Sequence, residues 1–158
     1  MQQELEKDND LFLKQKEDQS MTQNSPKDYA LQAQDVVLTF LKAMEGRDLE
    51  TAKSMLGSDF QMEFPGSGVM HSLPQLVDWA KERYQFVEKT MDDVSCAVKS
   101  ESVVCVYCHG TLSGRWIDGS AFEGIRFIDR FEICNNLIVR QDVWNDLALY
   151  APFENKQV

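Results

Sequence analysis

Carboxylates near the C-terminal end of the chain have the clearest capacity for chemistry. Residues 137–146 alternate in a way that predicts a β-strand, so every second side chain lies on the same side. One side of this strand carries Ile138, Arg140, Asp142, Trp144 and Asp146. A carboxylate in a dry cavity has a raised pKa and can move a proton to or from a carbon beside a carbonyl. Alternatively, these acids face water at the strand end or form ion pairs across the sheet with Arg126, Arg130 or Arg140.

A second carboxylate, Asp129, lies in the preceding predicted strand, and its partner depends on the connecting turn. If Asn135-Asn136 is a two-residue turn, Asp129 lies opposite Asp142. If the hairpin contains a bulge, the pairing shifts by one residue and Arg126 or Arg130 joins the Asp142 side.

The apolar pattern of this predicted strand, residues 122–134, favours the first of these pairings. It places Ile125, Phe127, Phe131 and Ile133 on one side, interrupted only by Asp129. An Asp129 buried among them is costly without a partner. We therefore expect Asp129 either to belong to a functional site or to form an ion pair with Arg140.

A third candidate group lies in a long strand predicted over residues 103–114. One side of this strand carries Tyr107, His109, Thr111 and Ser113. His109 is one of two histidines in the chain, and in a cavity it could serve as an acid, a base or a hydrogen-bond donor. On the surface it would be a structural residue.

The same strand contains a spacing that is typical of c-type haem attachment, because Cys105 and Cys108 are followed by His109. Side chains three residues apart in a strand point to opposite sides of the sheet. The two thiols are therefore badly placed to share a haem or a zinc ion, or to form a redox pair. We expect no metal and no organic cofactor.

Three helices are predicted in the first half of the chain. Ser25-Pro26-Lys27-Asp28 has the residues of a capping box and opens a helical apolar stripe that runs to Met44, before Gly46. Asp48 can cap a second, short helix that closes at Gly57. Ser72, with Gln75 three residues on, opens a third helix that is predicted to continue to Tyr84.

The strands are predicted by alternation of apolar and polar residues. The first covers residues 60–64, between the second and third helices. The others follow one another over 94–99, 103–114, 122–134 and 137–146. Helices that precede a run of antiparallel strands predict an α+β fold with the helices on one face of the sheet.

The bulk composition excludes several functions. The chain has 158 residues, 43% of them hydrophobic, with a formal net charge of −10, so we expect no nucleic acid and no membrane surface as partners. No stretch approaches the roughly 20 apolar residues of a membrane span. The N-terminal residues do not resemble a secretory signal. We therefore expect a cytoplasmic protein with reduced cysteines.

The ends of the chain differ from its middle. Residues 1–24 are rich in Gln, Glu, Lys, Asp and Asn, which predicts a disordered or loosely helical acidic tail. Residues 25–151 hold the periodic patterns and are expected to form one domain. Residues 152–158 are expected to be a short C-terminal tail.

Several short segments, in their order and spacing over residues 30–150, resemble the nuclear transport factor two-like superfamily and its SnoaL-like branch. They are the first helix with Gly46-Arg47-Asp48, the strand 60–64 with Pro65-Gly66, His71-Ser72-Leu73, residues 110–114, Asn135-Asn136-Leu137-Ile138 and residues 142–146. The resemblance implies a cone-shaped fold, in which a curved mixed or antiparallel sheet wraps around two to three N-terminal helices. Its members include polyketide cyclases, ketosteroid-isomerase-like enzymes, limonene-epoxide-hydrolase-like enzymes and non-catalytic binding domains.

The resemblance also implies where the site lies. It places Asp142, Trp144 and Asp146 in or near a cavity between the helices and the concave face of the sheet. Further residues expected there are Phe64, Trp79, Tyr84, Tyr107, Trp116, Arg126 and Phe127. His109-Gly110-Thr111 stands where the epoxide hydrolases resemble an Arg-x-Asp pair, and the missing charges argue against epoxide opening.

The resulting hypothesis is a cavity that binds a small apolar ligand carrying a carbonyl or a hydroxyl. If the protein is an enzyme, Asp142 with Asp129 or His109 is expected to act as general acid and base in an isomerisation, cyclisation or hydration. The alternative is a non-catalytic ligand-binding or dimerisation domain. We also expect a homodimer through the outer face of the sheet, where Val139 and Val143 could pack.

Overall fold

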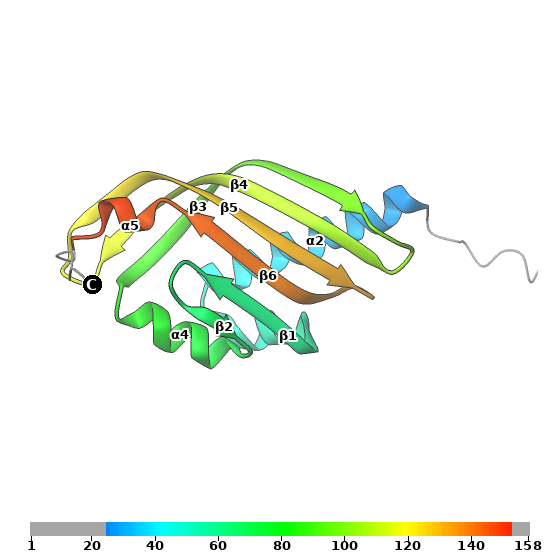
Figure 1. Cartoon of the computed structure of the whole chain (residues 1–158), viewed down its shortest axis with the longest axis horizontal. Coiled ribbons are helices and arrows are strands. Elements are labelled where there is room, and N and C mark those ends of the chain that lie inside the picture. The colour runs from blue at the N-terminus through cyan, green and yellow to red at the C-terminus, as the bar shows by residue number, and fades with distance from the viewer. Residues whose placement is uncertain (1–24, 153–158) are drawn as a thin grey trace, which may run out of the picture.

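The computed structural model describes residues 25–152, which form four helices and six strands (Figure 1). The helices are α2 (Pro26–Glu45), α3 (Leu49–Ser54), α4 (Leu73–Lys81) and α5 (Leu147–Tyr150). The strands are β1 (Leu56–Phe64), β2 (Gly68–Met70), β3 (Tyr84–Val98), β4 (Val103–Trp116), β5 (Ala121–Cys134) and β6 (Leu137–Asn145). The predictions for 1–24 and for the chain beyond 152 lie outside the described residues. Among residues 25–152, no helix has the length and apolar character needed to cross a bilayer.

The long helix α2 begins as the sequence predicts. The Ser25 hydroxyl accepts a hydrogen bond from the Asp28 N–H, and the Asp28 carboxylate accepts one from the Ser25 N–H at 2.8 Å, which completes the capping box. The helix buries one apolar face, and Phe40 on that face meets Phe131 of β5 edge-on, with ring centroids 6.1 Å apart. Burial of side chains of this size stabilises the fold by about 1.5–3 kcal/mol each.

The sheet is curved and mixed, with strand order β2-β1-β6-β5-β4-β3. β1 runs parallel to β6, and the other neighbours are antiparallel. Figure 1 shows α2 lying under the bend of the long strands, and α2 packs against β3 and β4. The α+β prediction and the wrapping of the sheet around the helices are confirmed. We call the face toward α2 the inner face and the opposite face the outer face.

The third helix ends earlier than predicted, and the next strand begins earlier. α4 stops at Lys81, and Tyr84 opens β3, whereas the sequence pattern extends the helix to Tyr84 and starts the strand at residue 94. The pairing of β3 with β4 is irregular between Tyr84 and Phe86 and again between Met91 and Asp93. These irregularities interrupt the alternation of apolar and polar residues, so the first half of β3 does not look like a strand in the sequence.

The predicted pairing of the last hairpin is wrong, although its turn is as expected. Asn135 and Asn136 have φ angles of 50° and 60°, as a two-residue hairpin turn requires, and Cys134 pairs with Leu137. The pairing then shifts because Val139 is an extra residue between Ile138 and Arg140. Val139 bulges beside Gly57, at the position where β1 joins β6.

This single bulge decides which residues of β6 face inward. Beyond it, Asp129 lies opposite Val143, and Arg130 lies opposite Asp142. The inner face therefore receives Gln141, Val143 and Asn145. Arg140, Asp142 and Trp144 lie on the outer face, which is the reverse of the predicted arrangement.

Candidate functional site

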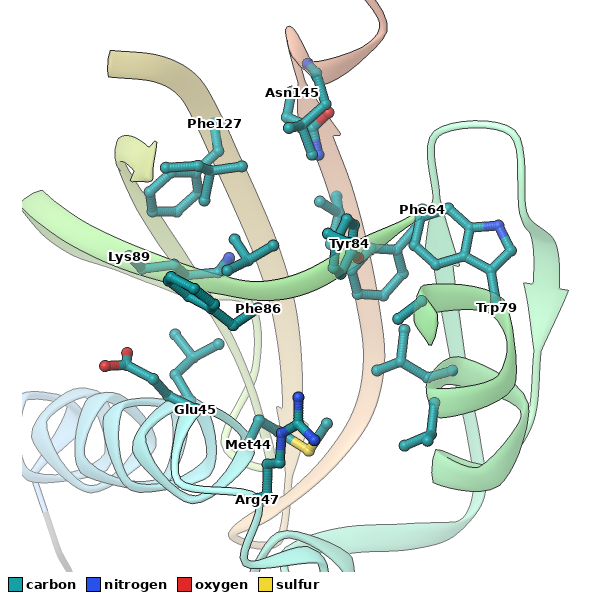
Figure 2. Close-up of a pocket in the computed structure, with 18 of the residues that line it drawn as sticks. Met44, Glu45, Arg47, Phe64, Trp79, Tyr84, Phe86, Lys89, Phe127 and Asn145 are labelled. Atoms are coloured by element: carbon teal, nitrogen blue, oxygen red, sulfur yellow. The ribbon is translucent and has the colours of Figure 1, made fainter. Parts of the chain in front are cut away.

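A cavity of about 420 Å³ lies between the C-terminal end of α2, α4 and the inner faces of β3, β5 and β6. Figure 2 shows Phe127 and Asn145 on one side of this pocket and Met44, Glu45 and Arg47 on the opposite side. The wall toward α4 carries Phe64 and Trp79 (Figure 2). The pocket therefore combines residues of the long helix α2 and the short helix α4 with residues of the sheet.

Four of the predicted aromatic residues, Phe64, Trp79, Tyr84 and Phe127, line this pocket. The rings of Phe64 and Trp79 are tilted, with centroids 5.4 Å apart, and Trp79 meets Tyr84 edge-on at 6.4 Å. Burial raises the pKa of Tyr84 to about 12. Its phenol is therefore neutral at physiological pH and can both donate and accept a hydrogen bond.

A lysine–aspartate pair lies at the inner face of the sheet. Lys89 lines the pocket, and its ammonium donates to Oδ2 of Asp129. The same Lys89 Nζ lies 4.1 Å from the ring centroid of Phe127, within the range of a cation–π contact. Asp129 is fully buried, whereas the Lys89 side chain is 21% exposed. The ion pair therefore joins the core of the sheet to the wall of the pocket.

Two side-chain oxygens of the inner face have unused hydrogen-bonding capacity. Oδ1 of Asp129 and Oε1 of Gln141 are buried and have no hydrogen-bond partner among residues 25–152. Gln141 lines the pocket and is 3% exposed. Native structures satisfy most buried polar atoms, so two such oxygens on one face call for an explanation.

The cysteines of β4 are separated by the sheet. Cys108 lies on the inner side, where burial and then the nearby Asp129 raise the pKa of its thiol to about 12. Cys105 lies on the outer side, with Sγ 3.5 Å from a guanidinium nitrogen of Arg130. The two thiols therefore lie on opposite sides of the strand, as the spacing predicts. Within residues 25–152, no cluster of three or more His, Cys, Asp or Glu side chains is arranged to hold a metal ion.

Asp142 does not face the pocket, so its predicted placement is wrong. It lies on the outer face, where its two oxygens accept from Arg130 at 2.9 Å and from Arg140 at 2.6 Å. Arg140 also donates to Gln61 and Glu63 of β1, at 2.9 and 3.0 Å. The bulge at Val139 causes this reversal, and the alternative of an ion-pair network across the sheet is the arrangement observed.

Other predicted site residues also lie away from the pocket. Trp144 is 53% exposed on the outer face, and Asp146 accepts from Arg126 at 2.7 Å beyond the end of β6. Tyr107 and His109 lie on the outer side of β4, and His109 is exposed. Trp116 is buried in a second apolar cluster, where it packs on Phe122 with ring centroids 4.6 Å apart.

Three polar residues that line the pocket, Lys89, Gln141 and Asn145, are not among those predicted from the sequence. Gln141, Val143 and Asn145 lie on the same side of β6. Once the bulge at Val139 is known, the apolar Val143 indicates that this side faces inward. Lys89 stands two residues from Val87 and from Met91, so it is a cation on an apolar side of an unrecognised strand.

Solved structures of low sequence identity share this architecture. An NTF2-like protein of unknown function from Burkholderia pseudomallei has a TM-score of 0.60 and 16% identity, over 75% of this chain and 94% of that one. A protein assigned as a SnoaL-like polyketide cyclase from Jannaschia sp. has a TM-score of 0.61 and 14% identity, over 80% and 92%. TerC, co-crystallised with polyporic acid, has a TM-score of 0.60 and 12% identity, over 75% and 95%. No protein-family model and no curated protein matches the sequence.

Proposed function

We propose that this chain, which has the nuclear transport factor two-like fold of the SnoaL-like kind, binds a small apolar molecule that carries a carbonyl or a hydroxyl. The pocket volume of about 420 Å³ lies within the usual range for small-molecule sites. Its walls are mainly aliphatic and aromatic, with few polar groups. TerC supports the proposal as a protein of this fold that was crystallised with a small molecule.

One observation carries the proposal: a donor and an unpartnered acceptor lie together in an apolar pocket. Lys89 supplies the donor, and the buried Oε1 of Gln141, without a partner in the described part of the chain, supplies the acceptor. A buried acceptor without a donor costs about 1–3 kcal/mol. A ligand hydroxyl removes this cost by donating to Oε1 of Gln141, whereas a ligand carbonyl accepts from Lys89, and in both cases the apolar body of the ligand contacts the walls.

The binding test uses a two-ring ketone, 2-acetonaphthone, and follows binding by isothermal titration calorimetry. We expect saturable binding to the native chain and loss of binding in Val143→Trp, which fills the pocket from β6. Trp144→Phe, on the outer face, is the matched control and should bind as the native chain does. Absence of binding, or binding unchanged by Val143→Trp, overturns the proposal.

The same groups suit proton-transfer chemistry without a cofactor. The Lys89 ammonium, held by Asp129, can donate to a carbonyl oxygen and stabilise the enolate that forms when a water molecule removes a proton from the adjacent carbon. This is the step shared by isomerases and cyclases of carbonyl compounds. Deuterium exchange at the acidic carbon of 2-tetralone, followed by NMR, tests it. Exchange faster than in a Lys89→Met control supports an enzyme, and exchange equal to that control supports a binding protein.

We also propose that a second copy of the chain covers the outer face, so that the protein is a homodimer. Ile128 and Trp144 lie opposite each other on β5 and β6 and are 39% and 53% exposed. Ion pairs of Arg126 with Asp146 and of Arg130 with Asp142 lie on either side of them. A patch with both signs of charge around an apolar centre is suited to a twofold contact with itself. Val143, expected in this contact from the sequence, faces the pocket instead.

Light scattering at micromolar concentration tests the homodimer. We expect a dimer mass for the native chain and a monomer mass for Trp144→Glu, because a charge buried in the contact is left unpaired. Val69→Glu, at a residue of β2 that is 47% exposed, is the matched control and should remain a dimer. A monomeric native chain overturns this proposal.

A further inference from the structure

The polar end of the pocket is electrically balanced, although it contains a lysine. The charge of Lys89 is compensated by Asp129, which is fully buried and binds it directly. Glu45, Arg47 and Lys81 also line the pocket, but all three are exposed at its opening. A carboxylate ligand that reached Lys89 would therefore meet a cation already neutralised by a buried anion, and would gain little in exchange for its lost hydration.

The inner face beside this ion pair has two buried hydrogen-bond acceptors without donors among the described residues, and Gln141, which carries one of them, lines the pocket. Oδ1 of Asp129 and Oε1 of Gln141 are both buried without a donor from residues 25–152. Phe131 pairs with Gln141 and Asp129 with Val143, so Asp129 and Gln141 are diagonal neighbours on the inner face. Whichever way the Gln141 amide is turned, a carboxylate oxygen of Asp129 can only accept. A ligand group that only accepts hydrogen bonds leaves these oxygens unsatisfied.

A hydroxyl group fits both features, because it accepts through its oxygen and donates through its hydrogen. We propose that the pocket selects a neutral hydroxyl, the phenol or enol of a largely apolar ring compound, over a carboxylate. Lys89 donates to the hydroxyl oxygen, and the hydroxyl hydrogen is donated to Oε1 of Gln141, the acceptor that lines the pocket without a partner in the described part of the chain. This inference rests on the proposed binding function and narrows it from any carbonyl or hydroxyl ligand to one that donates a hydrogen bond.

The test compares three naphthalenes of matched shape by isothermal titration at neutral pH. The first is 2-naphthol, which is neutral and donates. The second is 2-methoxynaphthalene, which keeps the oxygen but cannot donate, and the third is 2-naphthoate, which is an anion. We expect 2-naphthol to bind about tenfold more tightly than either of the others, because the alternatives leave buried acceptors unpaired.

The outcomes separate the inference from the function on which it rests. A preference for 2-naphthol of about threefold or more over both compounds supports the inference, and a smaller preference over either one overturns it while leaving binding intact. If none of the three binds, the proposed function fails and the inference fails with it. The comparison uses the native chain, so it does not depend on whether any variant folds.

Two variants sharpen the assignment to particular residues. Asp129→Asn leaves the Lys89 charge uncompensated, so 2-naphthoate should gain at least about tenfold relative to 2-naphthol. Asp142→Asn, on the outer face, is the matched control and should leave the ratio unchanged. Because Asp129→Asn removes a fully buried charge and can lose the fold, Gln141→Leu serves as a second variant. It should lower the preference of 2-naphthol over 2-methoxynaphthalene, and an unchanged preference in Gln141→Leu overturns the assignment of Gln141 as the acceptor.

Discussion

Each face of the central sheet carries an aspartate in a strand of the last hairpin, and the two are bound in opposite ways. Asp129, on the inner face, is fully buried, binds the Lys89 ammonium through Oδ2 and leaves Oδ1 without a partner in the described residues. Asp142, on the outer face, is 15% exposed and uses one oxygen for Arg130 and the other for Arg140. Both carboxylate oxygens of Asp142 therefore have hydrogen-bond partners, whereas only one oxygen of Asp129 has a partner among the described residues.

Two glutamines repeat this contrast. Gln61 on β1 accepts from Arg140 at 2.9 Å, whereas Gln141 on β6 has a buried Oε1 that accepts no hydrogen bond from the described residues. Buried polar groups that are fully paired specify and stabilise a structure, and those left with free capacity cost stability. The difference therefore separates a structural network on the outer face from a binding site on the inner face.

The test with the largest expected effect removes one cation from each face. Lys89→Met leaves the fully buried Asp129 without its partner, and we expect the free energy of unfolding to fall by about 3 kcal/mol. Arg140→Met leaves Asp142 with Arg130 and should cost about 1 kcal/mol. Urea denaturation measures both. Equal losses would contradict the distinction between the faces, and the double variant Lys89→Met/Asp129→Leu should recover most of the stability.

The second test changes the two glutamines in the same way. Gln141→Leu removes an unsatisfied acceptor from an apolar surface, so we expect stability to rise by about 1 kcal/mol while binding of 2-naphthol weakens. Gln61→Leu removes an acceptor that is paired with Arg140, so stability should fall by about 1 kcal/mol. The two changes have opposite signs, and thermal unfolding is sufficient to detect them. A loss of stability in Gln141→Leu would mean that the inner face needs this amide for its fold.

The sequence predicts the framework of the fold more fully than it predicts the site. The start of α2 is predicted from Ser25, Pro26 and Asp28, because capping depends on residues within one turn of each other. The meander from β4 to β6 is visible because alternation and turn residues are also local. These signals are enough to indicate the α+β class and the order of the elements other than β2 and α5.

The polar residues of the site depend on features that are not local. The extra residue Val139 fits where β1 joins β6, and it reverses the side on which every later residue of β6 lies. Lys89 stands in the irregular half of β3, where Asp92 interrupts the pairing with β4. Both irregularities arise from contacts between distant segments, so Asp142 is predicted on the wrong face and Lys89 is not predicted as a pocket residue.

The smallest expected effect is a dependence of stability on pH, and it comes from Glu132 in the ion-pair network of the outer face. Hydrogen bonds from Lys99 and from Arg130 lower the pKa of Glu132 below its ordinary value of 4.5. A lowered pKa in the folded state gives stability that is present above the unfolded-state pKa and is lost as the pH falls through the folded-state pKa. Glu132→Gln removes this contribution, which is at most about 1 kcal/mol for a partly exposed pair. The native chain should therefore exceed the variant in stability at neutral pH, and the gap should close below the ordinary pKa of Glu132, as measured by urea denaturation across that range. A gap that stays constant with pH would show that Glu132 acts through packing rather than through its charge.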